Sequence, residues 1–126
     1  MSRPIRAAIN LPALTHNLSI VRKYAPNSRI MAVIKADAYG HGLLPAAQAL
    51  RAADGFALLE LDAAIALREA GFKQPILLLE GFFSMQELQL FQQFQLNAVI
   101  HHNEQISMLL ASKERDLGLF MKINTG

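Results

Sequence analysis

Short apolar runs alternate with segments of helical periodicity along most of the chain. The clearest run, residues 30–34, is continuously apolar, as is typical of a strand buried on both faces of a sheet. Successive runs begin about 20 to 25 residues apart. The predicted strands are residues 5–9, 30–34, 55–59, 75–79, 98–100 and 117–124.

The segments between these runs have the marks of helices. Leu14, Leu18 and Val21 recur at spacings of four and three and give one apolar face. Ser84 and Glu87 have the spacing of a capping box, and Gly71 suits the end of a helix. The predicted helices are residues 11–24, 45–53, 61–70, 84–95 and 103–113.

Strands that alternate with helices and are themselves apolar predict an α/β fold with a parallel sheet. The short strand-to-strand spacing favours the N-terminal portion of a (β/α)8 barrel over a doubly wound sheet with long helices. We expect about five βα units, too few to close an eight-stranded barrel, so residues 1–126 are predicted to be an incomplete barrel domain. Residues 1–10 are expected to contribute a leading strand.

Composition narrows the functional classes. Apolar residues make up 52% of the 126 residues, which is enough for a packed core. The net charge of +2 comes from scattered basic residues, so nucleic acid is not an expected partner. No apolar run approaches the length of a membrane span or signal peptide, and cysteine is absent. We therefore expect a cytoplasmic protein without membrane contact.

The candidate chemistry follows the predicted strand at residues 30–34. Lys35 stands at its carboxyl end, the end that faces the active site in barrels and open parallel sheets. Tyr39 offers a hydroxyl for a phosphate, and Gly40 and Gly42 permit unusual backbone angles. These residues suit an aldehyde cofactor with a phosphate group. The alternatives are a solvent-exposed lysine that ends a strand and a tyrosine that only packs.

Residues 35–42 resemble the pyridoxal-5′-phosphate (PLP) attachment signature of alanine racemases. Residues 75–83 are similar to the catabolic branch of that family. The resemblance covers the whole chain but only the N-terminal part of the family's architecture. Supporting similarity is found at residues 7–18, 54–57, 67–71 and 122–126.

This resemblance implies a PLP-dependent isomerase that interconverts L-alanine and D-alanine, the latter linked to bacterial peptidoglycan. Lys35 would form the Schiff base with PLP and act as one of two catalytic bases. Tyr39 would bind the PLP phosphate, and Leu79 would line the cofactor pocket. The second base of the family is a tyrosine in a C-terminal β domain, contributed by the partner subunit of a homodimer. Because this domain is absent here, residues 1–126 alone are expected to be inactive.

Lys122, His41 and the pair His101 and His102 are further residues with candidate chemistry. In some members of the family the lysine that matches Lys122 is carbamylated, and the same is hypothesised here, although Asn124 departs from the more usual aspartate. His41 is interpreted as a loop-packing residue. The adjacent histidines His101 and His102 would point to opposite faces of a strand, and no carboxylate or cysteine cluster accompanies them, so no metal site is predicted.

Two alternative functions remain open on the sequence alone. One is a broad-specificity racemase that acts on serine, lysine or ornithine. The other is a non-catalytic PLP-binding barrel protein, although such proteins carry a shorter lysine motif without the tyrosine and the His-Gly pair that follow Lys35 here.

Overall fold

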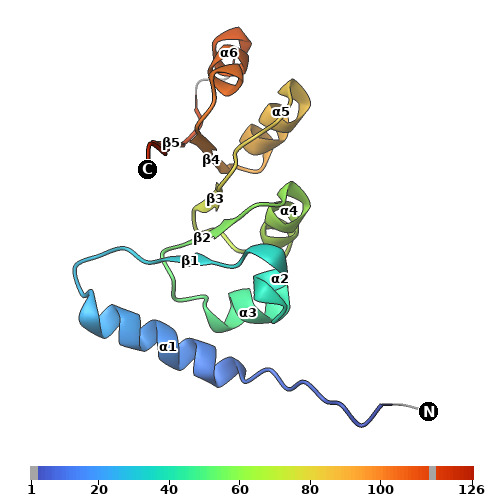
Figure 1. The fold of residues 1–126 in the computed structure, drawn as a ribbon, viewed down its shortest axis with the longest axis vertical. Helices are drawn as coiled ribbons and strands as arrows, with labels where there is room; N and C mark the ends of the chain where they lie inside the picture. Colours follow the sequence, from blue (N-terminus) through green and yellow to red (C-terminus); the bar gives the residue numbers. More distant parts are fainter. Residues whose placement is uncertain (1–2, 114–115) are drawn as a thin grey trace.

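The computed structural model describes residues 3–113 and 116–126. The described residues form a parallel sheet with helices between its strands (Figure 1). The strands are β1 (Met31–Val33), β2 (Gly55–Leu58), β3 (Ile76–Leu78), β4 (Asn97–Ile100) and β5 (Leu119–Met121). The helices are α1 (Leu11–Tyr24), α2 (Lys35–Tyr39), α3 (Leu43–Ala49), α4 (Leu61–Glu69), α5 (Met85–Gln93) and α6 (Asn103–Ala111).

The strands lie in the order in which they follow along the chain, β1-β2-β3-β4-β5, and each pairs in parallel with the next. Val33 is level with Ala57, and Leu58 is level with Leu78. A sheet that grows one strand at a time in a single direction is the arrangement of a (β/α)8 barrel wall. The predicted α/β class and incomplete barrel are confirmed.

The two faces of the sheet differ in what covers them. Phe56, Ile76 and Leu78 face the helices and belong to the main core, together with helix residues such as Leu67 and Phe91. The opposite face carries a smaller apolar cluster of Ala57, Leu77 and Val99, against which Met31 and Leu79 pack. This second face corresponds to the inside of a barrel.

The predicted leading strand at residues 5–9 is wrong. Residues 3–10 run as an extended segment away from the sheet and pair with no strand of the described chain (Figure 1). Ile5 is 79% exposed and Ile9 is 43% exposed. The branched apolar residues favour an extended backbone, but a strand also needs a neighbouring strand as hydrogen-bond partner.

The predicted helix boundaries are closest where capping residues mark them. The helix predicted at residues 11–24 is confirmed as α1, and the Asn10 side chain accepts a hydrogen bond from the Ala13 backbone N–H. At α5, Ser84 Oγ accepts from the Glu87 N–H at 3.1 Å, as predicted. The Glu87 carboxylate accepts from the N–H of Phe83, one residue before Ser84. No helix in the described residues is long and apolar enough to cross a bilayer.

Arg68 ties together two loops at the amino-terminal edge of the sheet. Its guanidinium donates to the carbonyls of Phe72 and Gln74, which precede β3, and to those of Phe94 and Gln95, which precede β4. Burial lowers the pKa of Arg68 from its ordinary value. These contacts are charge-assisted, and they fix an edge that lies opposite the carboxyl ends of the strands.

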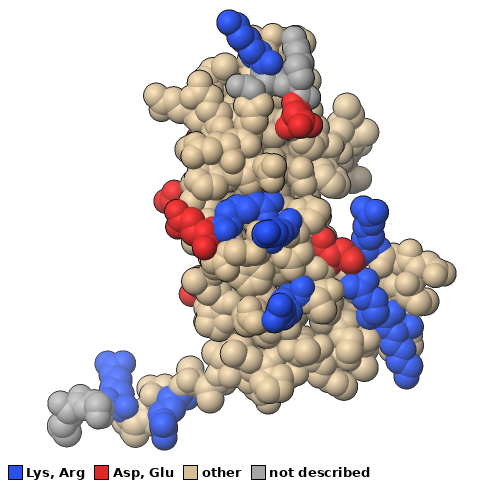
Figure 2. Space-filling model, turned by 180° about the vertical axis from the view of Figure 1, so that it is seen from behind, with Lys and Arg blue, Asp and Glu red and all other residues tan. Residues whose placement is uncertain are grey.

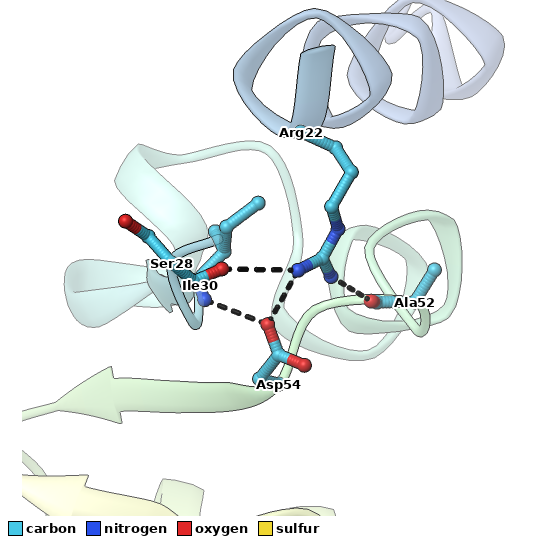
Figure 3. A network of polar contacts seen from close by, with 5 residues as sticks. All are labelled: Arg22, Ser28, Ile30, Ala52 and Asp54. Atoms are coloured by element: carbon cyan, nitrogen blue, oxygen red, sulfur yellow. Dashed lines mark hydrogen bonds and ion pairs between the residues drawn. The ribbon is translucent and has the colours of Figure 1, made fainter. Parts of the chain in front are cut away.

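A second polar network joins α1 to the beginnings of β1 and β2 (Figure 3). Asp54 accepts from the Ile30 N–H at 2.7 Å and from Arg22 Nη1 at 2.8 Å. Arg22 also donates to the carbonyls of Ser28 and Ala52. The hydrogen bond from Ile30, followed by the one from Arg22, holds the pKa of Asp54 below its ordinary value of 3.8.

The Asp54 network predicts a specific pH dependence of stability. The carboxyl pKa is lower in the folded protein than in the unfolded chain, so the network stabilises the fold above about pH 4 and loses this contribution as the pH falls through the folded pKa. Asp54→Asn is therefore expected to lower the melting temperature at neutral pH by an amount that shrinks as the solution is acidified. Melting curves of both proteins between about pH 7 and pH 3 measure this; a constant difference would contradict it.

On the face shown in Figure 2, basic and acidic side chains are interspersed among uncharged ones.

Candidate functional site

The carboxyl ends of the strands meet along one edge of the sheet and border a cavity of about 580 Å³. This volume lies within the range of about 300 to 1,000 Å³ that is usual for small-molecule sites. Four of the strand ends contribute to it. The lining residues are Lys35, Leu59, Leu77, Leu79, Glu80, Val99, Phe120, Met121, Lys122 and Ile123.

Backbone hydrogen bonds fix the positions of Leu79 and Lys122, and Lys35 directly follows Ile34, whose N–H donates to the Ala57 carbonyl at 2.9 Å. Leu79 follows β3 directly, and its N–H donates to the Leu58 carbonyl at 2.8 Å. Lys122 follows β5 directly, and its N–H donates to the Ile100 carbonyl at 2.9 Å. Lys35 comes two residues after β1 and is half-buried. The parallel ladder therefore extends past each strand and delivers the three side chains to one cavity.

The chemical character of the cavity is mixed. Lys35 and Lys122 contribute primary amines, and Glu80 contributes a carboxylate. Leu77 and Val99 are buried and form an apolar wall on the inner face of the sheet. An amine can attack a carbonyl carbon, a second cation can pair with an anion, and an apolar wall can cover a flat ring.

Lys35 opens a turn of left-handed helix that the sequence did not predict. Residues 36–39 have φ angles between 52° and 56°, followed by Gly40 at 83°. The glycines were expected to carry the unusual angles, and Gly40 and Gly42 do so, but four non-glycine residues share them. Left-handed backbone costs free energy at every residue with a Cβ, so contacts elsewhere must hold the turn.

The turn is braced by hydrogen bonds from the loop that follows it. Asp37 Oδ1 accepts from the Leu43 N–H at 2.8 Å, and the Asp37 carbonyl accepts from the N–H groups of Gly40 and Gly42. His41 Nδ1 lies 2.8 Å from the Ala38 carbonyl oxygen. Since a carbonyl only accepts, Nδ1 of His41 carries the proton. This contact agrees with the interpretation of His41 as a loop-packing residue.

Tyr39 lies at the end of this turn rather than in the cavity wall. Its side chain is 59% exposed, and it is not among the residues that line the cavity of Lys35. The structure therefore brings Lys35, Leu79 and Lys122 together and leaves Tyr39 outside their cavity, largely exposed.

The sequence did not predict the buried side chain of Gln105, which holds the backbone at Glu80. Gln105 of α6 is 4% exposed, and its Nε2 donates to the carbonyls of Glu80 and Val99 at 2.9 and 3.2 Å. Its Oε1 accepts from the His101 N–H at 2.9 Å. One buried amide thus links the ends of β3 and β4 at the edge of the cavity. In the sequence Gln105 has no mark that separates it from an ordinary exposed helix residue.

The side chains of the two adjacent histidines form hydrogen bonds with backbone groups. The His101 ring lies 3.2 Å from the Glu80 carbonyl through Nε2, and His102 Nδ1 accepts from the Glu104 N–H at the start of α6. Both border a separate cavity of about 170 Å³ beside Phe82 and Phe83. Among the described residues, no three His, Cys, Asp or Glu side chains are grouped so as to hold a metal ion.

The residues of the larger cavity fit PLP. Its aldehyde requires a primary amine, its phosphate requires cations or hydrogen-bond donors, and its ring requires an apolar surface. Lys35 and Lys122 supply amines, and Leu79 with Val99 supplies the apolar surface within one cavity.

Comparison with known proteins gives a consistent result. Residues 9–126 match the family described as "Alanine racemase, N-terminal domain". The chain is 63% identical to the alanine racemase of Nitrosomonas europaea and 53% identical to the catabolic alanine racemase of Klebsiella aerogenes, in each case over all of this chain. It spans about a third of the length of these relatives, 35% and 36% respectively.

Solved structures show the same similarity. The biosynthetic alanine racemase of Pseudomonas aeruginosa superposes with a TM-score of 0.93 and 38% sequence identity. The match covers 99% of this chain and 36% of that structure. The fold and the expected sequence resemblance are thus both confirmed.

Proposed function

Because this chain belongs to the alanine racemase family, we propose that it is the N-terminal, PLP-binding part of an enzyme that interconverts L-alanine and D-alanine. One observation carries the proposal: Lys35, Leu79 and Lys122 follow three different strands, β1, β3 and β5, and line the same cavity at the carboxyl edge of the sheet. Lys35 is the residue at which the family signature begins, and it opens a strained turn, a feature that concentrates at functional sites.

In this proposal Lys35 is the residue that would hold PLP through Nζ, and its free amine would exchange the α-proton on one face of the substrate. PLP, when bound, withdraws electrons from the α-carbon so that its proton can be removed. Leu79 and Val99 line the cavity and would offer the cofactor ring an apolar surface that excludes water. Tyr39, which is largely exposed here, would bind the phosphate, and this role requires its hydroxyl to be directed toward the cofactor.

Racemisation requires a second base on the opposite face of the substrate. In the family this base comes from a C-terminal β domain of the partner subunit, so we propose that the active enzyme is a homodimer located in the cytoplasm. Its product or substrate, D-alanine, would connect it to peptidoglycan. Residues 1–126 on their own are expected not to racemise alanine, because Lys35 can act on one face only.

Lys122 is a candidate for a covalent modification that mass spectrometry can detect. We propose that its amine is carbamylated in the full-length enzyme, which turns a cation in the cavity of Lys35 into an anion able to orient a basic group. Mass spectrometry of the intact protein under non-denaturing conditions is expected to show one added CO2, absent from Lys122→Ala. An unmodified amine in the full-length enzyme would contradict this part of the proposal.

A substrate panel tests the function itself. Full-length protein loaded with PLP is incubated with each enantiomer of alanine, serine, lysine and ornithine, and the products are separated by chiral chromatography. We expect alanine to be racemised with the highest kcat/KM. Comparable rates on all four amino acids would favour a broad-specificity racemase, and PLP binding without any racemisation would favour a non-catalytic PLP-binding protein.

A further inference from the structure

We propose that Asp37 is a positioning residue for Lys35, because its carboxylate and carbonyl hold the left-handed turn that begins at Lys35. The inference rests on the proposed function in one respect, namely that Lys35 is the residue that binds PLP. The existence and the bracing of the turn are independent of that function.

The turn is a conformation that its own residues do not favour. Ala36, Asp37, Ala38 and Tyr39 all have φ between 52° and 56°. In this region the Cβ of an L-residue comes close to a carbonyl oxygen. Asp and Asn tolerate it better than other residues because their short polar side chains bond to nearby backbone groups, whereas alanine has no such group. Asp37 is therefore the member of the four that suits the turn best.

Asp37 supplies three of the hydrogen bonds that fix the turn. Its carbonyl accepts from the N–H of Gly40 at 3.1 Å and from that of Gly42 at 3.0 Å. Its Oδ1 accepts from the N–H of Leu43 at 2.8 Å. The backbone bonds close the loop on itself, and the carboxylate bond connects the loop to the next helix.

That next helix is anchored in the core. Leu43 is the first residue of α3, and Gly42 before it has no side chain to cap the helix. Ala46 and Ala47 of α3 are 2% and 0% exposed. The carboxylate of Asp37 thus transmits the fixed position of α3 to the turn and, through it, to Lys35.

Removal of the carboxylate should loosen the turn without unfolding the protein. A fraction of molecules would then adopt relaxed turns in which Lys35 is misplaced. Because only the correctly placed fraction binds PLP, the apparent affinity falls in proportion to that fraction. Loss of a helix-capping hydrogen bond of this kind shifts the equilibrium between the braced and the relaxed turn by about twofold to thirtyfold.

The experiment uses three variants of the full-length protein. Asp37→Asn keeps an acceptor oxygen and the tolerance of left-handed backbone. Asp37→Ala removes the acceptor, and Asp37→Gly removes it while relieving the backbone strain. Titration of each apoprotein with PLP, followed by the absorbance band near 420 nm, is expected to give a Kd raised about tenfold for Asp37→Ala and Asp37→Gly and nearly unchanged for Asp37→Asn. An affinity that survives in both the Ala and Gly variants would overturn the inference.

A second measurement follows the turn without any cofactor. Trypsin cuts after Lys35 only when this segment opens, and the rate follows the open population. Cleavage of the apoproteins at this bond, identified by fragment mass, is expected to be about tenfold faster in Asp37→Ala and Asp37→Gly than in the parent or Asp37→Asn. Equal rates in all four proteins would overturn the bracing role even if PLP never bound, so this failure is distinguishable from failure of the proposed function.

Glu87→Ala is the matched control. Glu87 also accepts a hydrogen bond from a backbone N–H at the start of a helix, at 2.6 Å from Phe83 N, but it belongs to α5. Its removal should lower the melting temperature and leave both the PLP affinity and cleavage after Lys35 unchanged. If Glu87→Ala changed these readouts as much as Asp37→Ala does, the effect would be one of general stability, and the positioning role would be rejected.

Discussion

Replacement of Lys35 by alanine is expected to abolish alanine racemisation by the full-length enzyme. Acid–base catalysis by one side chain contributes about 10² to 10⁴ in rate, and Lys35 is proposed to supply both a base and the cofactor anchor, so we expect a loss of about 10³-fold or more. The absorbance band near 420 nm that develops with PLP in the parent protein should be absent. Chiral chromatography and spectrophotometric titration measure the two effects.

The matched control for this variant is Lys122→Ala. Lys122 lines the same cavity and carries the same functional group. It is expected to retain the absorbance band. An absorbance band that persists in Lys35→Ala and disappears in Lys122→Ala would show that Lys122, and not Lys35, binds the cofactor.

The largest effect on stability is expected for Gly81→Ala. Gly81 is buried, has φ of +71°, and follows the cavity residue Glu80. A Cβ there would overlap the Val99 carbonyl oxygen and stand 2.5 Å from Gln105 Nε2, which donates to that same carbonyl. Left-handed strain, steric overlap with backbone and disturbance of a buried hydrogen bond together should cost about 3 to 5 kcal/mol. Urea denaturation of the apoprotein measures the loss.

Gly71→Ala is the control that separates the cost of left-handed backbone from the cost of steric overlap. Gly71 has φ of +90°, yet a Cβ at this position would meet no atom within 4 Å. We expect it to cost only the left-handed preference, about 1 kcal/mol. Equal losses of unfolding free energy in the two variants would show that overlap of the added Cβ with Val99 and Gln105 does not contribute.

The pattern of a parallel sheet placed Lys35 at the carboxyl end of a strand, because continuous apolar runs marked the strands. Leu79 and Lys122 were assigned by the resemblance to alanine racemases, and in the structure all three residues line one cavity. The runs overestimated the strand lengths: Ile30 and Ile34 flank β1 but do not belong to it. Apolar character reports burial, whereas a strand ends where its hydrogen-bond ladder ends.

Other features could not be predicted because they depend on long-range contacts. Alanine and tyrosine do not favour left-handed backbone, so three of the four residue types do not indicate the turn after Lys35; its conformation is held by the hydrogen bonds of Asp37, one of which comes from the first residue of α3. Gln105 is buried because its amide finds the carbonyls of Glu80 and Val99, and its residue type alone predicts exposure. That residues 5–9 pair with no strand among the described residues is likewise a property of the tertiary fold.

The most direct test of the account locates the cofactor on the chain. Full-length protein is loaded with PLP, reduced with sodium borohydride to make the attachment permanent, and digested for peptide mass mapping. We predict one pyridoxyl phosphate group, carried by the peptide that contains Lys35 and by no other. A group on the Lys122 peptide, or no labelled peptide at all, would contradict the central claim that Lys35 is the cofactor anchor of this cavity.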